Sequence, residues 1–142
     1  MLRIDPFQRA DLPIIADFVA AIQEHERTTV PTLKTGEEIR SSYTNRIVER
    51  ATARRGMILL ARDGTDVVGF ICAWIDQDSD PLLSDEARDH AYVSDLYVSP
   101  DARRRGVARR LLDAVAQDDG RARLPAHAHL LQGEQQICAR LL

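Results

Sequence analysis

The sequence predicts an α/β (α+β) domain with one central sheet flanked by helices. Short runs rich in β-branched and aromatic residues are typical of strands, and they occur at 57–62, 67–75 and 92–98. Apolar residues recur at helical spacing in three other segments, near 12–27, 36–53 and 107–116. A chain of 142 residues with 44% hydrophobic residues is long enough for one well-buried domain, so we expect residues 1–142 to form a single domain.

The first elements are a short strand and two helices. Leu2 to Ile4 is predicted as the strand, and Asp11-Leu-Pro13 marks a helix start because proline is favoured just inside a helix N-terminus. This helix ends near 24–27, and its apolar face holds Ile14, Ile15, Phe18, Val19 and Ile22. A second helix, about Gly36 to Ala53, has on its inner face Ile39, Tyr43, Ile47 and Val48.

Strands dominate the middle of the chain. Met57 to Arg62 and Val67 to Ile75 are predicted strands, joined by the hairpin turn Asp63-Gly-Thr-Asp66. Asp80 to Arg88 is predicted as a polar connector. The next strand, from Tyr92 to Val98, ends at a Ser-Pro-Asp break before the last periodic helix.

The turn between this strand and the last helix is suited to binding a phosphate. Several backbone N–H groups at a helix start lack intrahelical partners, and the helix dipole favours negative charge there. Gly106 has no side chain and Ala108 has a small one, so a diphosphate can approach these N–H groups closely. The sequence adds positive charge with Arg103, Arg104, Arg105 and Arg109, whereas we assign Arg110 to solvent.

The pattern Arg103-x-x-Gly106-x-Ala108, preceded by Leu96-Tyr-Val98 and followed by an amphipathic helix, resembles the coenzyme A-binding motif of the GNAT superfamily of N-acetyltransferases. The resemblance covers residues 1–117 by element order and is strongest at 92–117. It implies a GNAT-like mixed, mostly antiparallel sheet and acetyl-CoA as cosubstrate. The CoA-binding residues that it implies are Leu96, Tyr97, Val98, Arg103, Arg104, Arg105, Gly106, Val107, Ala108 and Arg109.

Two other interpretations of the arginine-rich turn are a nucleic-acid patch and the solvated face of a helix. Lys plus Arg number 19 against 22 Asp plus Glu, so the formal net charge is −3. The turn also lacks interleaved aromatic residues on which bases could stack. These observations favour a local anion site on an acidic protein, and we expect no nucleic-acid partner.

The resemblance also implies acetyl transfer to an amine, with backbone N–H groups near Leu96 polarising the acetyl carbonyl. Asp95 is the candidate to orient or deprotonate the acceptor amine, and a structural hydrogen-bonding carboxylate is the equal alternative. Ser94 is a second candidate because it stands where similar polyamine-type enzymes have a glutamate, which leaves the general base open. His25, with its acidic neighbours, and His90 are weaker candidates, since exposed histidines are the more common outcome.

Residues 118–142 depart from the family pattern. The segment lacks the tyrosine that the resemblance implies as general acid, because no tyrosine follows Tyr97. Read one nucleotide later, codons allowed for residues 130–142 can encode a family-like segment with a Phe-Tyr pair, so we hypothesise a truncated or frameshifted C-terminus. The gene sequence tests this hypothesis, and an alternative frame without that pair would contradict it.

The leading functional prediction is N-acetyl transfer from acetyl-CoA to a primary amine of a small molecule or a protein. The alternative is a CoA-binding acetyltransferase remnant with little or no activity. The sequence has no metal-like spacing, no membrane-length apolar window and no apolar leader, so we expect no metal, no membrane partner and a cytoplasmic location. A homodimer is possible if a shortened sheet leaves a strand edge uncovered.

Overall fold

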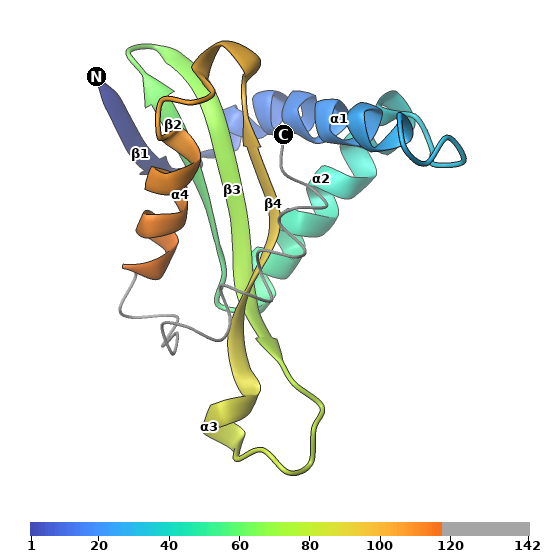
Figure 1. Ribbon diagram of the computed structural model, residues 1–142, viewed down its shortest axis with the longest axis vertical. Coiled ribbons are helices and arrows are strands. Elements are labelled where there is room, and N and C mark those ends of the chain that lie inside the picture. The colour runs from blue at the N-terminus through green and yellow to red at the C-terminus, as the bar shows by residue number, and fades with distance from the viewer. Residues whose placement is uncertain (118–142) are drawn as a thin grey trace.

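The computed structural model describes residues 1–117, and it confirms the α/β fold with an antiparallel sheet flanked by helices (Figure 1). The elements in chain order are β1 (Leu2–Pro6), α1 (Leu12–Arg27), α2 (Gly36–Ala53), β2 (Met57–Asp63), β3 (Asp66–Gln77), α3 (Asp85–Arg88), β4 (Asp89–Val98) and α4 (Val107–Ala116). Two short 3-10 helices, Arg9–Asp11 and Pro100–Ala102, precede α1 and α4. The expectations about residues 118–142 lie outside the described residues.

The sheet has the strand order β1-β2-β3-β4, and each neighbouring pair is antiparallel. The predicted hairpin between β2 and β3 is present, with Asp63 paired to Asp66. The mixed sheet that the resemblance implies needs a parallel neighbour, and within residues 1–117 every strand pair is antiparallel. In this part of the chain β4 is therefore the last strand.

The two faces of the sheet support different helices (Figure 1). Successive side chains of a strand point to opposite faces, so Phe70, Cys72 and Trp74 of β3 pack with α1 and α2. Ile71 and Ala73 point the other way and pack with α4. The central strand β3 is thus buried from both sides, and this burial holds the three helices to one sheet.

Helices α1 and α2 begin and pack much as predicted. Pro13 lies in the first turn of α1, and the side chain of Thr35 caps α2 by accepting a hydrogen bond from the backbone N–H of Glu38 at 3.1 Å. At Gly36 the two helices approach closely, since a Cβ there would lie 2.5 Å from the carbonyl oxygen of Ala20. Residues with any side chain would push α2 away from α1 at this point.

Helix α4 is held by a narrow apolar stripe. Val107, Leu111 and Val115 recur every four residues and are 3%, 0% and 4% exposed. They pack on a cluster that includes Ile71 and Leu96 of the sheet. This contact places the N-terminus of α4 beside the end of β4.

Several predicted boundaries differ from the structure. The predicted connector Asp80 to Arg88 contains the one-turn helix α3, because Ser84 caps it by accepting from the N–H of Ala87. Strand β4 begins at Asp89 rather than at Tyr92, since its polar start pairs with the equally polar end of β3. Strand β1 likewise continues to Pro6, which pairs with Leu59. Pairing partners decided these strand ends, and local composition did not reveal them.

Candidate active site and anion-binding turn

The turn that joins β4 to α4 has its backbone arranged around an exposed helix start. Arg104 and Gly106 both adopt positive φ angles, of 61° and 76°. The N–H of Arg110 donates the first hydrogen bond of α4, to the carbonyl of Gly106 at 3.0 Å, so the N–H groups of Val107, Ala108 and Arg109 precede it. Gly106 is the N-cap residue, and as a glycine it has no side chain that could accept hydrogen bonds from these N–H groups. The helix start therefore offers several donors to an anion.

A hollow of about 330 Å³ lies over this helix start and is lined by Val98, Ala102, Arg103, Arg104, Gly106, Val107 and Ala108. Its size is at the lower end of the range of small-molecule sites. A Cβ built on Gly106 would meet, apart from its chain neighbours, no atom of the described residues within 4 Å. A side chain at this position would thus extend into open space beside the helix start.

The structure separates the predicted arginines by what they contact. The Nε of Arg103 donates to the carbonyl of Val98 at 2.9 Å, and its guanidinium lies 5.8 Å from the ring centroid of Tyr97. Arg105 pairs with Asp63 and Arg109 with Asp113. Within residues 1–117, Arg104 has no ion-pair partner, so it is the cation of the turn that is least committed to the protein.

Two contacts connect the basic turn to the far edge of the sheet. Arg105 hydrogen-bonds to Asp63 at 3.1 Å, and this contact, with a further one from the terminal ammonium, lowers the pKa of the Asp63 carboxyl. Arg110 donates to the carbonyl of Leu2 at 2.9 Å and remains exposed, consistent with its assignment away from the site. Both contacts brace the turn against β1 and the β2–β3 hairpin.

The strand residues that are predicted to bind CoA have buried side chains. Leu96, Tyr97 and Val98 are 1%, 7% and 3% exposed. The ring of Tyr97 packs 4.8 Å from that of Phe18 in the core. Their side chains are therefore unavailable to a ligand, which could contact these residues only through their backbone groups.

A β-bulge interrupts β4 at the predicted catalytic residues. Cys72 pairs with Asp95 while Ala73 pairs with Val93, so Ser94 is the extra residue of the bulge. Ser94 is 6% exposed, and its hydroxyl donates to the carbonyl of Cys72 at 3.3 Å. Bulges re-aim side chains and interrupt the pairing of the ladder, so backbone groups beside Ser94 are available to a ligand.

Asp95 is 1% exposed and points to the face of the sheet that α1 and α2 cover. The hydroxyl of Tyr43, in α2, donates to its two carboxylate oxygens at 3.1 and 3.0 Å. The sequence placed Tyr43 on the inner face of its helix but did not link it to the site. No local signal joins the two residues, since they lie 52 positions apart.

Cys72 faces Asp95 across the strand pair and is fully buried. Burial raises the pKa of the Cys72 thiol to about 12; a hydrogen bond with Ser94 opposes this rise, and the negative charge of Asp95 adds to it. A thiol that stays protonated is a poor nucleophile, so Cys72 is a core residue and not a catalytic one.

The raised pKa of Cys72 predicts a pH-dependent stability. The native thiol keeps its proton above pH 9, where the thiol of the unfolded chain has lost it, so the free energy of unfolding falls as the pH rises. Between pH 8 and pH 10 the wild type should lose about 1 kcal/mol more than a Cys72→Ala variant. Urea unfolding at the two pH values measures this difference, and equal losses in the two proteins would contradict it.

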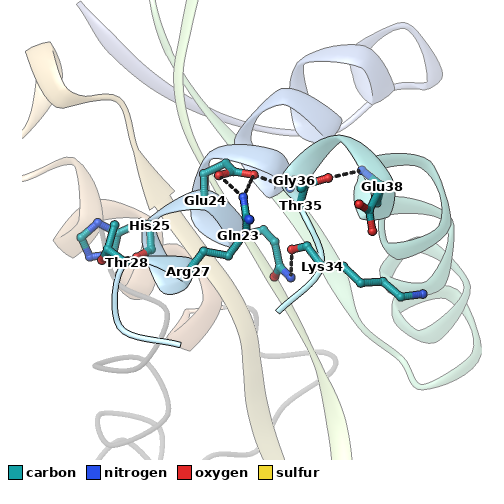
Figure 2. Close-up of polar contacts among 9 residues, drawn as sticks. All are labelled: Gln23, Glu24, His25, Arg27, Thr28, Lys34, Thr35, Gly36 and Glu38. Carbon is teal, nitrogen blue, oxygen red and sulfur yellow. Dashed lines mark hydrogen bonds and ion pairs between the residues drawn. The ribbon is translucent and has the colours of Figure 1, made fainter. Parts of the chain in front are cut away.

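The histidine candidate at the end of α1 lies in a different kind of environment (Figure 2). Glu24 accepts the backbone N–H of Gly36 at 2.7 Å and pairs with Arg27. The hydrogen bond from Gly36 lowers the pKa of Glu24, with burial opposing it and Arg27 adding to it. His25 is exposed, and its ring points away from the Glu24 carboxylate. This cluster joins α1 to the start of α2 and shows the arrangement of a helix terminus.

No group of three or more His, Cys, Asp and Glu side chains in residues 1–117 is placed to hold a metal ion. In the same part of the chain, no helix has the length and apolar character needed to span a bilayer.

The sequence matches the model of the acetyltransferase (GNAT) family over residues 19–130. Solved structures with a similar fold include a GCN5-related N-acetyltransferase from Ralstonia eutropha, with 18% identity, a TM-score of 0.66, and coverage of 99% of this chain and 90% of that one. An acetyltransferase from Vibrio fischeri has 18% identity, a TM-score of 0.61, and coverage of 81% and 84%.

A predicted acetyltransferase from Clostridium acetobutylicum, solved with acetyl-CoA, is also similar, with 13% identity, a TM-score of 0.63, and coverage of 97% of this chain and 87% of that one. No protein of curated function matches the sequence.

Proposed function

The chain belongs to the acetyltransferase (GNAT) family, and from this membership we propose that it transfers the acetyl group of acetyl-CoA to a primary amine. The observation that carries the choice of cosubstrate is the turn before α4. Within residues 1–117 it combines helix N–H groups that have no intrahelical partner, an open face at Gly106 and the cation of Arg104, which makes no ion pair in this part of the chain. These features suit the pyrophosphate of CoA.

Different residues of the site fit different parts of acetyl-CoA. The N–H groups at the start of α4 and the side chain of Arg104 would hold the pyrophosphate, while Arg103 and Arg105 brace the turn. The backbone of Leu96, Tyr97 and Val98 would bind the pantetheine arm along β4. Acetyl-CoA supplies an activated acetyl group, and the N–H groups of β4 near the bulge at Ser94 would polarise its carbonyl.

A primary amine is the acceptor that the family's chemistry favours, and the chain offers no competing protein nucleophile at the bulge. The Cys72 thiol is buried and protonated, and the Ser94 hydroxyl is buried and bonded to a carbonyl. Direct attack by the bound amine, held close to the thioester, is therefore the proposed mechanism. A reduced, buried Cys72 also suits the cytoplasmic location that we propose.

The test is acetyl-CoA consumption with thiol detection in the presence of n-butylamine, benzylamine or a lysine-containing peptide. We expect amine-dependent release of free thiol and saturable binding of CoA by calorimetry. CoA binding without thiol release for any amine would favour the non-catalytic CoA-binding alternative. Strong, salt-dependent binding to DNA with no binding to CoA would overturn the proposal.

A further inference from the structure

A side-chain hydrogen bond in the candidate site joins α2 to β4. Tyr43 donates its hydroxyl hydrogen to Asp95, with oxygen-to-oxygen distances of 3.1 and 3.0 Å. The carboxylate is 1% exposed, whereas the tyrosine is only partly buried. The pair lies one residue from the bulge at Ser94, where the proposed function places the acetyl carbonyl.

The geometry points to Tyr43 as a catalytic residue that contacts the acceptor amine, with Asp95 as the positioning residue behind it. This assignment rests on the proposed function and deepens it. The Asp95 carboxylate is too buried to serve as the first contact for an amine. Tyr43 is only partly buried as a residue, so its side chain connects that carboxylate to the less buried side of α2.

The other two tyrosines of the chain are differently engaged. Tyr97 is 7% exposed and packs on Phe18, and Tyr92 stacks 5.3 Å from Trp74. Among the described residues, Tyr43 is the tyrosine whose hydroxyl is bonded to a carboxylate. The neighbouring hydroxyl, of Ser94, is directed to the carbonyl of Cys72.

The direction of the hydrogen bond determines what Tyr43 can do. A tyrosine hydroxyl has one hydrogen to donate and oxygen lone pairs that accept. Because Asp95 takes the hydrogen, the Tyr43 oxygen is held as an acceptor for an N–H of the amine. The hydroxyl is thereby kept from donating to the nitrogen lone pair, which must remain available to attack the thioester.

The same pair stabilises the charge that develops during attack. Positive charge grows on the nitrogen as its lone pair bonds to the acetyl carbon. A buried carboxylate polarises the hydroxyl that it binds and makes the Tyr43 oxygen a stronger acceptor. Preorganised electrostatic contacts of this kind act on the transition state more than on the bound substrate.

The amine nitrogen forms the N–C bond, and the C–S bond breaks with its electron pair on sulfur. One nitrogen proton, which becomes far more acidic as the nitrogen turns into an amide, passes to the Tyr43 oxygen while the Tyr43 proton passes to Asp95. The thiolate takes a proton from solvent and Asp95 returns one to solvent, so the products are the N-acetyl amine and CoA.

The test compares Tyr43→Phe with Tyr92→Phe in the full chain, using the most active amine of the panel and saturating acetyl-CoA. Both changes remove one hydroxyl from a partly buried tyrosine on the same face of the sheet. We expect kcat to fall about 100-fold in Tyr43→Phe, within the usual range for a proton-transfer group, and to stay within about twofold in Tyr92→Phe. CoA affinity, measured by calorimetry, should be unchanged in both variants.

Asp95→Asn separates the positioning role from a purely structural one. It should lower kcat by about tenfold or more with little change in the KM for the amine, and the double variant should be no slower than Tyr43→Phe, because both residues act through one hydroxyl. Losses that add in the double variant, or that fall on CoA affinity and thermal stability rather than kcat, would show a structural role.

The outcomes distinguish this assignment from the proposed function. A wild-type chain that releases no thiol with any amine overturns the proposed function and this assignment with it. An active wild type with an equally active Tyr43→Phe variant overturns this assignment alone. An active wild type with the selective loss of kcat in Tyr43→Phe and Asp95→Asn supports both.

Discussion

Replacing Gly106 with valine is expected to weaken CoA binding about 100-fold, or about 2.7 kcal/mol. The φ angle of Gly106 is 76°, a left-handed conformation that costs a residue with a Cβ about 1–2 kcal/mol, so valine would strain the turn and displace the N–H groups that are proposed to hold the pyrophosphate. The valine side chain would also occupy the open space beside the helix start, where the pyrophosphate is proposed to bind.

Arg104→Ala should weaken binding less, by about tenfold, because it removes one charge-assisted contact and leaves the backbone donors in place. Calorimetric titration of CoA into both variants tests the order of the two effects. Undiminished affinity in Gly106→Val would remove the proposed site from this turn.

Gly64→Val is the matched control for backbone strain. Gly64 has a φ of 62°, and a Cβ there would also meet no atom of residues 1–117 within 4 Å apart from its chain neighbours. It lies in the hairpin between β2 and β3, which the proposed ligand does not contact. This variant should be less stable than the wild type but should bind CoA as tightly, and an equal loss of affinity would mean that Gly106→Val acts through stability alone.

Leu111→Ala is expected to lower the free energy of unfolding by about 2–5 kcal/mol. Leu111 is 0% exposed and lies at the centre of the stripe that packs α4 on the sheet. Its truncation leaves a cavity between α4 and the strands that neighbouring side chains cannot fully fill. Denaturant unfolding followed by circular dichroism measures the loss.

Leu112→Ala is the matched control for this change. Leu112 is the next residue of the same helix and is only partly buried against the same cluster. We expect this variant to lower the free energy of unfolding by about 1 kcal/mol or less, because the atoms that it removes are partly exposed to solvent. Equal losses in the two variants would show that α4 does not depend on its buried stripe.

Most elements could be predicted because their signals are local. The helix of 36–53 has the predicted bounds, and the apolar residues predicted for α1 include its four buried ones, Ile15, Phe18, Val19 and Ile22. The turn before α4 could be located because glycine, arginines and a change of period stand together within a few residues. These features depend on backbone conformation and on the spacing of apolar residues, and both are determined by residues close together in the sequence.

The contacts within the site could not be predicted in the same way. Five nearby arginines look equivalent in the sequence, yet one stacks on Tyr97, two pair with carboxylates, one binds the carbonyl of Leu2, and Arg104 keeps no such partner within residues 1–117. The partners of Arg105 and Arg110 lie in the β2–β3 hairpin and in β1, far away in the sequence, and only folding brings them to the turn. Arg109, by contrast, pairs with Asp113 of its own helix at (i, i+4) spacing, and Arg103 contacts the end of β4.

Asp95 shows most clearly the difference between what the sequence predicts and what the tertiary structure decides. Its residue type and its place near the end of a strand marked it as a candidate from the sequence, where a catalytic and a structural carboxylate were equal alternatives. Its burial, the bulge beside it and its bond to Tyr43 depend on the register of β3 against β4 and on the packing of α2 over the sheet. Short-range patterns therefore identified the family and the turn that we propose to bind the pyrophosphate, whereas long-range packing brought together Tyr43 and Asp95, which lie 52 positions apart.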